Sequence, residues 1–366
     1  MAHNLNSTPL DQKALAEAKP NARGKSRRSQ SAAESGMNKG ERLWMVFTLS
    51  TVPIFLYMFL ALRHFHQELE KRDMEVYPFS DFKFCIAAAC AFYFIKNFWE
   101  RVSYPLICPL ISEKHVGAER ANRTKRVIKW IFDFFYFTSF TTFGYYHFRS
   151  FLPMCLGGPS NCDLNFLDHP YPRQTKWVRE YYLLQMSHLF FKIFDQIIKK
   201  RKDVKFWEYF LHHFLSFVMV IHSYTSHFTR AGTITLLALD LTDIFLSSLR
   251  AQEALKYQIK YFFPIYYGLT LAMWIYIRGL VYPLCIVRTA WELFFLDIYP
   301  PRARICDAFF AIMTTFLAVM NFYWIFALAQ VGVRSAKTKS YANVYDPVLL
   351  KNSAKEIEGE DAKKKN

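Results

Sequence analysis

Four ionisable side chains lie inside two neighbouring apolar segments, each long enough to form a membrane-spanning helix. His212 and His213 are adjacent in the first segment, and Asp240 and Asp243 are three residues apart in the second. A charged group in hydrocarbon costs roughly 2.5–3.5 kcal/mol even on a lenient insertion scale. A functional role is the usual reason for keeping such groups in a membrane, so these four are the candidate catalytic residues.

The two segments are expected to pack as antiparallel helices, because only the short turn FTRAG joins them. If the first enters the membrane near Trp207, the histidines lie roughly 8–9 Å deep at a rise of 1.5 Å per residue. Asp243 reaches a similar depth on the returning helix, and Asp240 lies one turn deeper on the same face. The imidazoles and carboxylates are thus predicted to meet in one pocket near the cytosolic leaflet, with Glu208 placed to orient His212.

Three kinds of site are open to these residue types. A buried His–Asp network could lock the two helices together. Two imidazoles and two carboxylates could hold zinc or iron, although adjacent histidines point about 100° apart on a helix and suit one metal ion poorly. A neutral imidazole oriented by a carboxylate could instead remove a proton from an amine or accept an acyl group. We favour this acid–base or nucleophilic chemistry.

A membrane bundle is expected to hold the pocket, because 52% of the 366 residues are hydrophobic and 18% are aromatic. The pattern predicts an all-α integral membrane protein with about eight transmembrane helices, and six or seven also fit. Two spans are the weakest because charged side chains interrupt them, namely Lys83 and Lys96 in the second, and Lys192 and Asp195 in the fourth. The expected spans are 43–62, 79–99, 127–148, 180–198, 207–227, 232–249, 259–288 and 305–330.

Basic residues exceed acidic ones by sixteen, and the excess gathers in the N-terminal tail, in 101–126 and in KKRKDVK at 199–205. With eight spans these segments share one side, which the positive-inside rule assigns to the cytosol together with both termini. Topology and attraction to anionic lipid account for this charge. Nucleic-acid binding is not expected, because the basic runs merely flank membrane spans.

Beyond the four candidates, the flanking residues resemble a known family. KRKDVKFWEYFLHH…HSYTSHFTRAGTITLLALDLTDIFLSSLR is similar to the longevity-assurance motif of ceramide synthases, in the TLC-domain superfamily. Leu239 stands where many members have His, and no homeobox-like insert separates the first two spans, as in the fungal and plant type. The matching residues besides the His and Asp pairs are Ser223, Tyr224, Arg230, Gly232, Leu246, Arg250 (usually Lys), Trp274, Arg278, Pro283, Asn321, Tyr323 and Trp324.

The resemblance implies a helical bundle that encloses a tunnel for lipid tails. It also implies N-acylation of sphingosine or sphinganine by a fatty acyl-CoA, giving ceramide or dihydroceramide. Acyl-CoA is then a substrate, and no cofactor or metal is implied. His212 is the better candidate for the acylated group or base, His213 would position the carbonyl, and Asp240 and Asp243 would hold the imidazoles. The implied substrate-binding residues are Trp274, Arg278, Asn321, Tyr323 and Trp324.

Several alternatives stay open. Arg278 could form a buried ion pair or lie near coenzyme A phosphates. A non-catalytic TLC protein, acting as a lipid sensor or a translocation chaperone of the endoplasmic reticulum, would share the helix count, and a metal-dependent lipid hydroxylase is the rival enzyme. A small accessory subunit and a homo- or heterodimer are also open. Cys155 and Cys162, in the expected lumenal loop, could form a disulfide or remain thiols.

The predicted organisation has four parts. Residues 1–40 form a disordered basic cytosolic tail, and 41–119 hold the first two transmembrane helices and a loop. Residues 120–332 form the TLC-like catalytic domain, and 333–366 a cytosolic tail. Lys363 and Lys364 resemble a dilysine retrieval signal, which predicts the endoplasmic reticulum membrane.

Overall fold

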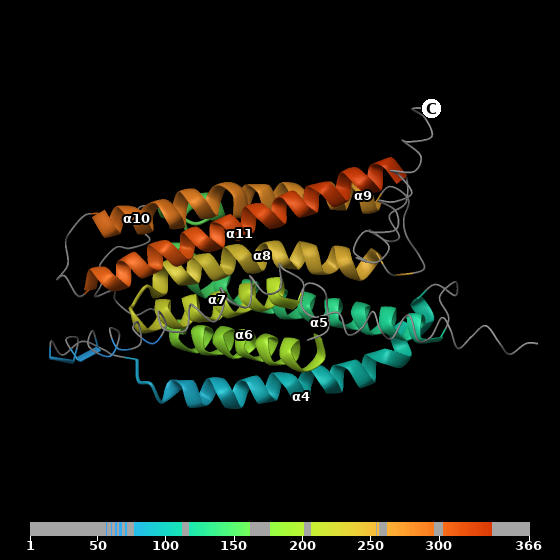
Figure 1. Cartoon of the computed structure of the whole chain (residues 1–366), viewed down its shortest axis with the longest axis horizontal. Helices are drawn as coiled ribbons and strands as arrows, with labels where there is room; N and C mark the ends of the chain where they lie inside the picture. Colours follow the sequence, from blue (N-terminus) through green and yellow to red (C-terminus); the bar gives the residue numbers. More distant parts are fainter. Residues whose placement is uncertain are drawn as a thin grey trace, which may run out of the picture. The chain divides into compact units, whose positions relative to one another are not determined.

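The computed structural model shows an all-helical bundle, as predicted (Figure 1). It describes residues 56, 60, 63, 66–67, 70–71, 77–111, 117–161, 176–200, 206–253, 255, 262–295 and 303–338. The helices are α4 (Asp81–Ile107), α5 (Gly117–Phe148), α6 (Val178–Lys200), α7 (Phe206–Thr225), α8 (Thr229–Glu253), α9 (Phe262–Trp274), α10 (Arg288–Phe295) and α11 (Ala303–Thr338). Shorter turns are η1 (Cys108–Leu110), η2 (Arg149–Phe151), η3 (Met154–Leu156) and the π-helical η5 (Ile275–Val281) and η6 (Pro283–Val287).

Four described segments are long and apolar enough to cross a membrane, which confirms the multi-pass class. They are Asp81–Leu110, Thr229–Gln252, Phe263–Phe295 and Arg304–Val333, at the expected second, sixth, seventh and eighth spans. α5, α6 and α7 form helices at the third, fourth and fifth. The first span, 43–62, falls almost entirely outside the described residues, as do both predicted tails, RKDVK at 201–205 and Cys162.

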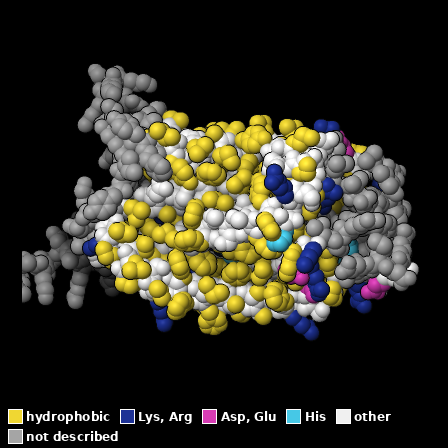
Figure 2. Space-filling view, turned by 180° about the vertical axis from the view of Figure 1, so that it is seen from behind, with side chains coloured by type: hydrophobic (Ala, Val, Ile, Leu, Met, Phe, Trp, Pro, Cys, Tyr) yellow, Lys and Arg dark blue, Asp and Glu magenta, His cyan; other side chains and the backbone are white. Residues whose placement is uncertain are grey.

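The surface of the bundle suits a lipid environment. Figure 2 shows hydrophobic side chains over most of one face, with charged side chains toward its ends. On α4 the outward side chains are large and exposed, including Phe94, Phe98 and Leu106, which are each 69–70% exposed. Apolar side chains on this scale are stable outward only against hydrocarbon or a partner, which agrees with a membrane-spanning bundle.

α8, which carries both aspartates, lies between the other helices (Figure 1). It packs most extensively along α5 and also contacts α7, α9 and η5. A close approach between α5 and α8 depends on Gly144, because a Cβ there would lie 2.1 Å from Leu237 Cδ2. α7 and α8 are in contact as predicted, but α5 is the main support of α8, which the sequence pattern did not indicate.

The charges that interrupt the expected second and fourth spans are paired with one another. Lys96 Nζ on α4 lies 2.6 Å from Asp195 Oδ2 on α6. Lys192, also on α6, forms an ion pair with Asp133 on α5. All four side chains are at least 86% buried, so each charge is neutralised across a helix interface rather than solvated. These charges therefore join α4, α5 and α6 and do not argue against the helices that carry them.

The turn between α7 and α8 is built from residues of the recognised motif. Tyr182 OH lies 2.9 Å from Ser223 Oγ and donates to Thr229 O at 3.0 Å. A Cβ on Gly232 would lie 2.0 Å from Tyr182 OH and 2.2 Å from Ser223 Oγ, so only glycine fits there. Tyr224 OH donates to Asp81 Oδ2 at 2.5 Å, which ties the same turn to the start of α4. These motif residues hold the hairpin at the end of the bundle away from the histidines.

Cys155 Sγ lies 3.4 Å from Cys285 Sγ. The two alternatives expected for Cys155 and Cys162, a disulfide or two thiols, both stay open, because only Cys155 lies among the described residues. Cys162 itself is among the residues that are not described.

Candidate active site

Arg278 is the centre of the hydrogen-bonded part of the site. The residue is only 3% exposed, and it donates from η5 across to α8. Nη2 lies 2.7 Å from Asp243 Oδ1, and Nε lies 2.7 Å from Thr242 Oγ1. The guanidinium carbon also stacks over the Trp274 ring, 4.1 Å from its centroid. Of the two expected roles for Arg278, the structure contains the buried ion pair.

The π-helical backbone around Arg278 helps to place it. η5 follows α9 directly, and Pro283, which has no backbone N–H to donate, begins η6. π-helical turns within long helices occur frequently at functional sites, because the wider turn shifts the side chains that follow. Trp274, at the last residue of α9, donates from Nε1 to Thr242 O at 3.2 Å. Trp274 and Arg278 thereby both bind Thr242 of α8.

His212 and His213 lie on α7 with ring centroids 5.4 Å apart and ring planes tilted by 51°. Within the part of the chain that the structure describes, His212 Nδ1 is buried and has no hydrogen-bond partner. Arg278 lies close enough to act electrostatically on His212, Asp240 and Asp243. Arg278 therefore contacts Asp243 and acts electrostatically on His212 and Asp240, and His213 adjoins His212.

α11 packs against α7. The Trp324 ring stacks on Tyr209 of α7, with centroids 5.2 Å apart, and Tyr323 lies beside Glu208. Because the helices are antiparallel, one turn deeper brings Asn321 to the level of the histidines. Asn321 is fully buried, and its Oδ1 accepts from Arg278 Nη1 at 3.3 Å.

Two further polar atoms in this region are buried with no hydrogen-bond partner among the described residues. They are Asn321 Nδ2 and Glu208 Oε1. Together with His212 Nδ1 they supply a donor, an acceptor and an imidazole nitrogen. A native protein seldom buries polar atoms without partners, so a polar ligand between α7 and α11 would explain all three.

Asp240 has a partner that the sequence did not suggest. Gln185 on α6 donates from Nε2 to Asp240 Oδ2 at 2.6 Å, and Tyr136 OH on α5 donates to Gln185 Oε1 at 2.8 Å. The sequence signal was a lone amide inside the apolar part of α6. The carboxylates were expected to hold the imidazoles, but their hydrogen bonds in the described structure go to Gln185 and Arg278.

Not all predicted substrate-binding residues line this interior. Trp274, Arg278 and Asn321 are buried around Asp243, whereas Tyr323 is 51% exposed. Among the described residues, no group of three or more His, Cys, Asp or Glu side chains has an arrangement that would hold a metal ion.

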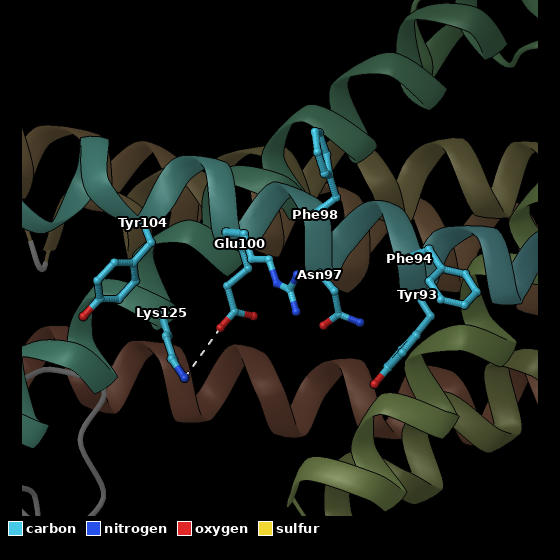
Figure 3. Close-up of a pocket in the computed structure, with 8 residues that line it drawn as sticks. Tyr93, Phe94, Asn97, Phe98, Glu100, Tyr104 and Lys125 are labelled. Atoms are coloured by element: carbon cyan, nitrogen blue, oxygen red, sulfur yellow. Dashed lines mark ion pairs between the residues drawn. The ribbon is translucent and has the colours of Figure 1, made fainter.

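A groove of about 910 Å³ lies elsewhere, on α4 and the start of α5 (Figure 3). There Lys125 and Glu100 point toward each other, 3.7 Å apart, beside Tyr104 and Arg101. None of the candidate catalytic residues lines it. The groove is therefore a separate surface feature.

Comparison with known proteins agrees with this arrangement of helices and motif. The family model of the TLC domain matches residues 126–330, which include all nine predicted site residues, and the chain belongs to this family. It is 23% identical over 234 residues to ceramide synthase hyl-1 of Caenorhabditis elegans, which covers 60% of this chain and 60% of that protein.

Relatives in other kingdoms carry related names. The chain is 24% identical over 298 residues to ceramide synthase LAG1 of Saccharomyces cerevisiae, covering 76% of this chain and 66% of that protein. It is 24% identical over 182 residues to ceramide synthase LOH2 of Arabidopsis thaliana, covering 48% of this chain and 60% of that protein. The matched region thus spans roughly three fifths to two thirds of these relatives.

Proposed function

We propose that this protein is a ceramide synthase, which joins a fatty acyl-CoA to the amine of a sphingoid long-chain base in the endoplasmic reticulum membrane. The observation that carries the proposal is the set of buried polar atoms without hydrogen-bond partners among the described residues, His212 Nδ1, Asn321 Nδ2 and Glu208 Oε1. The names of the relatives support the substrate pair, since they are ceramide synthases.

The proposed reaction breaks the C–S bond of the thioester and forms a C–N bond to the amine. The amine gives up a proton, and the leaving thiolate of coenzyme A takes one up. His212 is the group proposed to carry that proton, or to hold the acyl group between two steps. A sphingoid amine is mostly protonated at neutral pH, so it first loses one proton to water before it can attack, and the second proton, lost as the amide forms, is the one that His212 passes to the thiolate.

The surrounding residues are assigned supporting roles. His213 would position the thioester carbonyl, and Asn321 Nδ2 would donate to its oxygen as negative charge develops there. Glu208 would attract the ammonium form of the base toward the site. Asp240 and Asp243 would stabilise the positive charge that a protonated imidazole brings into the bundle. The polyanionic end of acyl-CoA would stay on the basic cytosolic side, near 101–126.

The test is amide formation. The chain is expressed in a host whose own ceramide synthase has been removed. Two preparations are compared: the membranes of that host, and the protein purified from them with any bound small subunit. Each is incubated with sphinganine and acyl-CoAs of varied length, and amide is measured by mass spectrometry. We expect amide from wild type and a loss of at least about 10³-fold in His212→Ala and Asp240→Asn. Wild-type protein that forms no amide in either preparation would overturn the proposal.

Matched variants separate chemistry from folding. His222→Gln changes another buried histidine of α7, whose Nε2 contacts Cys306 O at 3.0 Å at the other end of the helix. Amide formation by His222→Gln should stay within a few-fold of wild type, per amount of folded protein. Elemental analysis of the purified chain is part of the same test, because a stoichiometric metal ion with no amide would identify a metal-dependent enzyme instead.

A further inference from the structure

Asp240 and Asp243 differ in the group that donates a hydrogen bond to each carboxylate. Asp243 accepts from the Arg278 guanidinium, which carries a full positive charge. Asp240 accepts at Oδ2 from Gln185, which is a neutral amide. A cation neutralises a buried carboxylate, whereas a neutral amide orients it and leaves its charge free to respond to a proton nearby. Asp243 is thus part of an ion pair, and Asp240 is the carboxylate suited to answer a change of charge on an imidazole.

The Gln185 amide is itself fully constrained. Nε2 donates to Asp240 Oδ2 at 2.6 Å and to Tyr181 OH at 3.2 Å, which uses both of its hydrogens. Oε1 accepts from Tyr136 OH at 2.8 Å. If the amide turned over, Oε1 would face a carboxylate oxygen, and neither of these two acceptors carries a hydrogen to donate. Only one orientation of the amide satisfies all three neighbours.

The two tyrosines that orient Gln185 are held in turn by aromatic packing. The Tyr136 ring stacks on His188 with centroids 3.5 Å apart and on Phe140 at 4.4 Å. Tyr181 lies edge-on to Phe148 at 5.3 Å and is 1% exposed. The chain of contacts therefore runs from α5 and α6 into α8, and it explains in part why α5 is the main packing partner of α8.

We infer that Gln185 is a positioning residue, which holds the Asp240 carboxylate in the orientation needed for catalysis and is fixed for that purpose by Tyr136 and Tyr181. This role rests on the proposed N-acyltransferase activity. Nothing in the recognised motif includes Gln185, because it lies on α6, before the motif begins. A displacement of about 1 Å in a catalytic group can reduce turnover about 10²-fold. Loss of the 2.6 Å hydrogen bond from Gln185 to Asp240 should therefore lower kcat by a measurable amount.

The first experiment replaces the amide by an apolar side chain of similar length. Gln185→Met should lower kcat by about 10- to 100-fold, with KM for sphinganine and acyl-CoA within about 2-fold of wild type. Tyr136→Phe removes one of the three bonds that orient the amide, so it should lower kcat less, by about 3- to 10-fold. A matched control is Gln196→Met, about three turns later on α6, which removes a bond of 3.1 Å from Nε2 to Phe206 O. That control should lower the thermal midpoint but leave kcat per folded molecule near wild type.

The second experiment is a double-mutant cycle. If Gln185 acts through Asp240, the Gln185→Met/Asp240→Asn variant should be no slower than Asp240→Asn alone, whereas independent effects would multiply. The same four proteins are compared by thermal midpoint in detergent, which needs no turnover, and the two single shifts should not add. Additive effects in both cycles, or a Gln185→Met enzyme with wild-type kcat, would overturn the positioning role. Wild-type protein without amide synthesis would instead overturn the proposed function, and the midpoint cycle would still report on the contact.

Discussion

Arg278 Nη2 and Asp243 Oδ1 lie 2.7 Å apart in the interior of the bundle, with the arginine side chain 4% exposed and the aspartate 28%. Arg278 also donates to Thr242 and Leu239 on α8, the helix of Asp243, and to Asn321 on α11. One side chain therefore joins η5, α8 and α11 and brings a positive charge close to both aspartates. The pair is at once a packing element and the electrostatic environment of the site.

Removing one partner of this ion pair should be more damaging than removing both. Arg278→Gln leaves the Asp243 carboxylate without its cation, which should lower the free energy of unfolding by about 3–5 kcal/mol. Arg278→Gln/Asp243→Asn should recover part of that loss because no buried charge is left without its partner. Thermal unfolding of the purified variants in detergent measures both effects.

A surface pair is the matched control. Arg288 and Glu292 also form a 2.7 Å ion pair, but their side chains are 61% and 46% exposed. Arg288→Gln should change stability by less than about 1 kcal/mol. Equal losses at Arg278 and Arg288 would contradict the assignment of a buried, structurally important pair at Arg278.

Gly232 should not tolerate even a methyl group. Gly232→Ala would place Cβ about 2 Å from Tyr182 OH and Ser223 Oγ, two groups that are hydrogen-bonded to each other. The overlap should cost about 1–3 kcal/mol and separate the start of α8 from α7. Gly268→Ala on α9 is the control, since nothing lies within 4 Å of a Cβ there. It should be neutral or slightly stabilising, because alanine favours a helix over glycine by about 1 kcal/mol.

Substitution in the buried Lys96–Asp195 pair should change stability more than substitution in an exposed ion pair. Lys96→Met leaves Asp195 buried without this cation, so it should lower the thermal midpoint and the yield of folded protein. Lys96→Met/Asp195→Leu should be more stable than either single variant, because an apolar contact replaces a buried ion pair in hydrocarbon. A double variant less stable than both single variants would show that the charges act through another partner.

The sequence was sufficient for the class of fold, because that class depends on local composition. Long apolar helices and the His and Asp pairs are visible in single segments, and Arg278 acts electrostatically on three of these four residues. The short turn between the two segments also predicted correctly that α7 and α8 are in contact.

Partners that depend on packing between distant segments could not be predicted in this way. Gln185 lies 55 residues before Asp240, and Asp243 meets Arg278 across 35 residues. Lys96 and Asp195 appeared as interruptions of two spans because their pairing, 99 residues apart, has no local signal. The dominance of α5 as the support of α8 has the same origin, since close packing at Gly144 depends on the shape of both helices.

Asn321 should contribute to catalysis through its unpartnered nitrogen and to structure through its oxygen, and one substitution separates the two. Asn321→Asp keeps an oxygen to accept from Arg278 Nη1 but removes the Nδ2 donor, which has no hydrogen-bond partner among the described residues. If Nδ2 donates to the developing oxyanion, kcat for amide synthesis per folded molecule should fall about 10²- to 10³-fold, whatever the added buried charge does to the thermal midpoint. Asn97→Asp on α4, which lines the separate groove, makes the same chemical change away from the site and should leave kcat unchanged. A wild-type kcat in Asn321→Asp would remove Asn321 from the catalytic assignment and leave its bond to Arg278 as its only role.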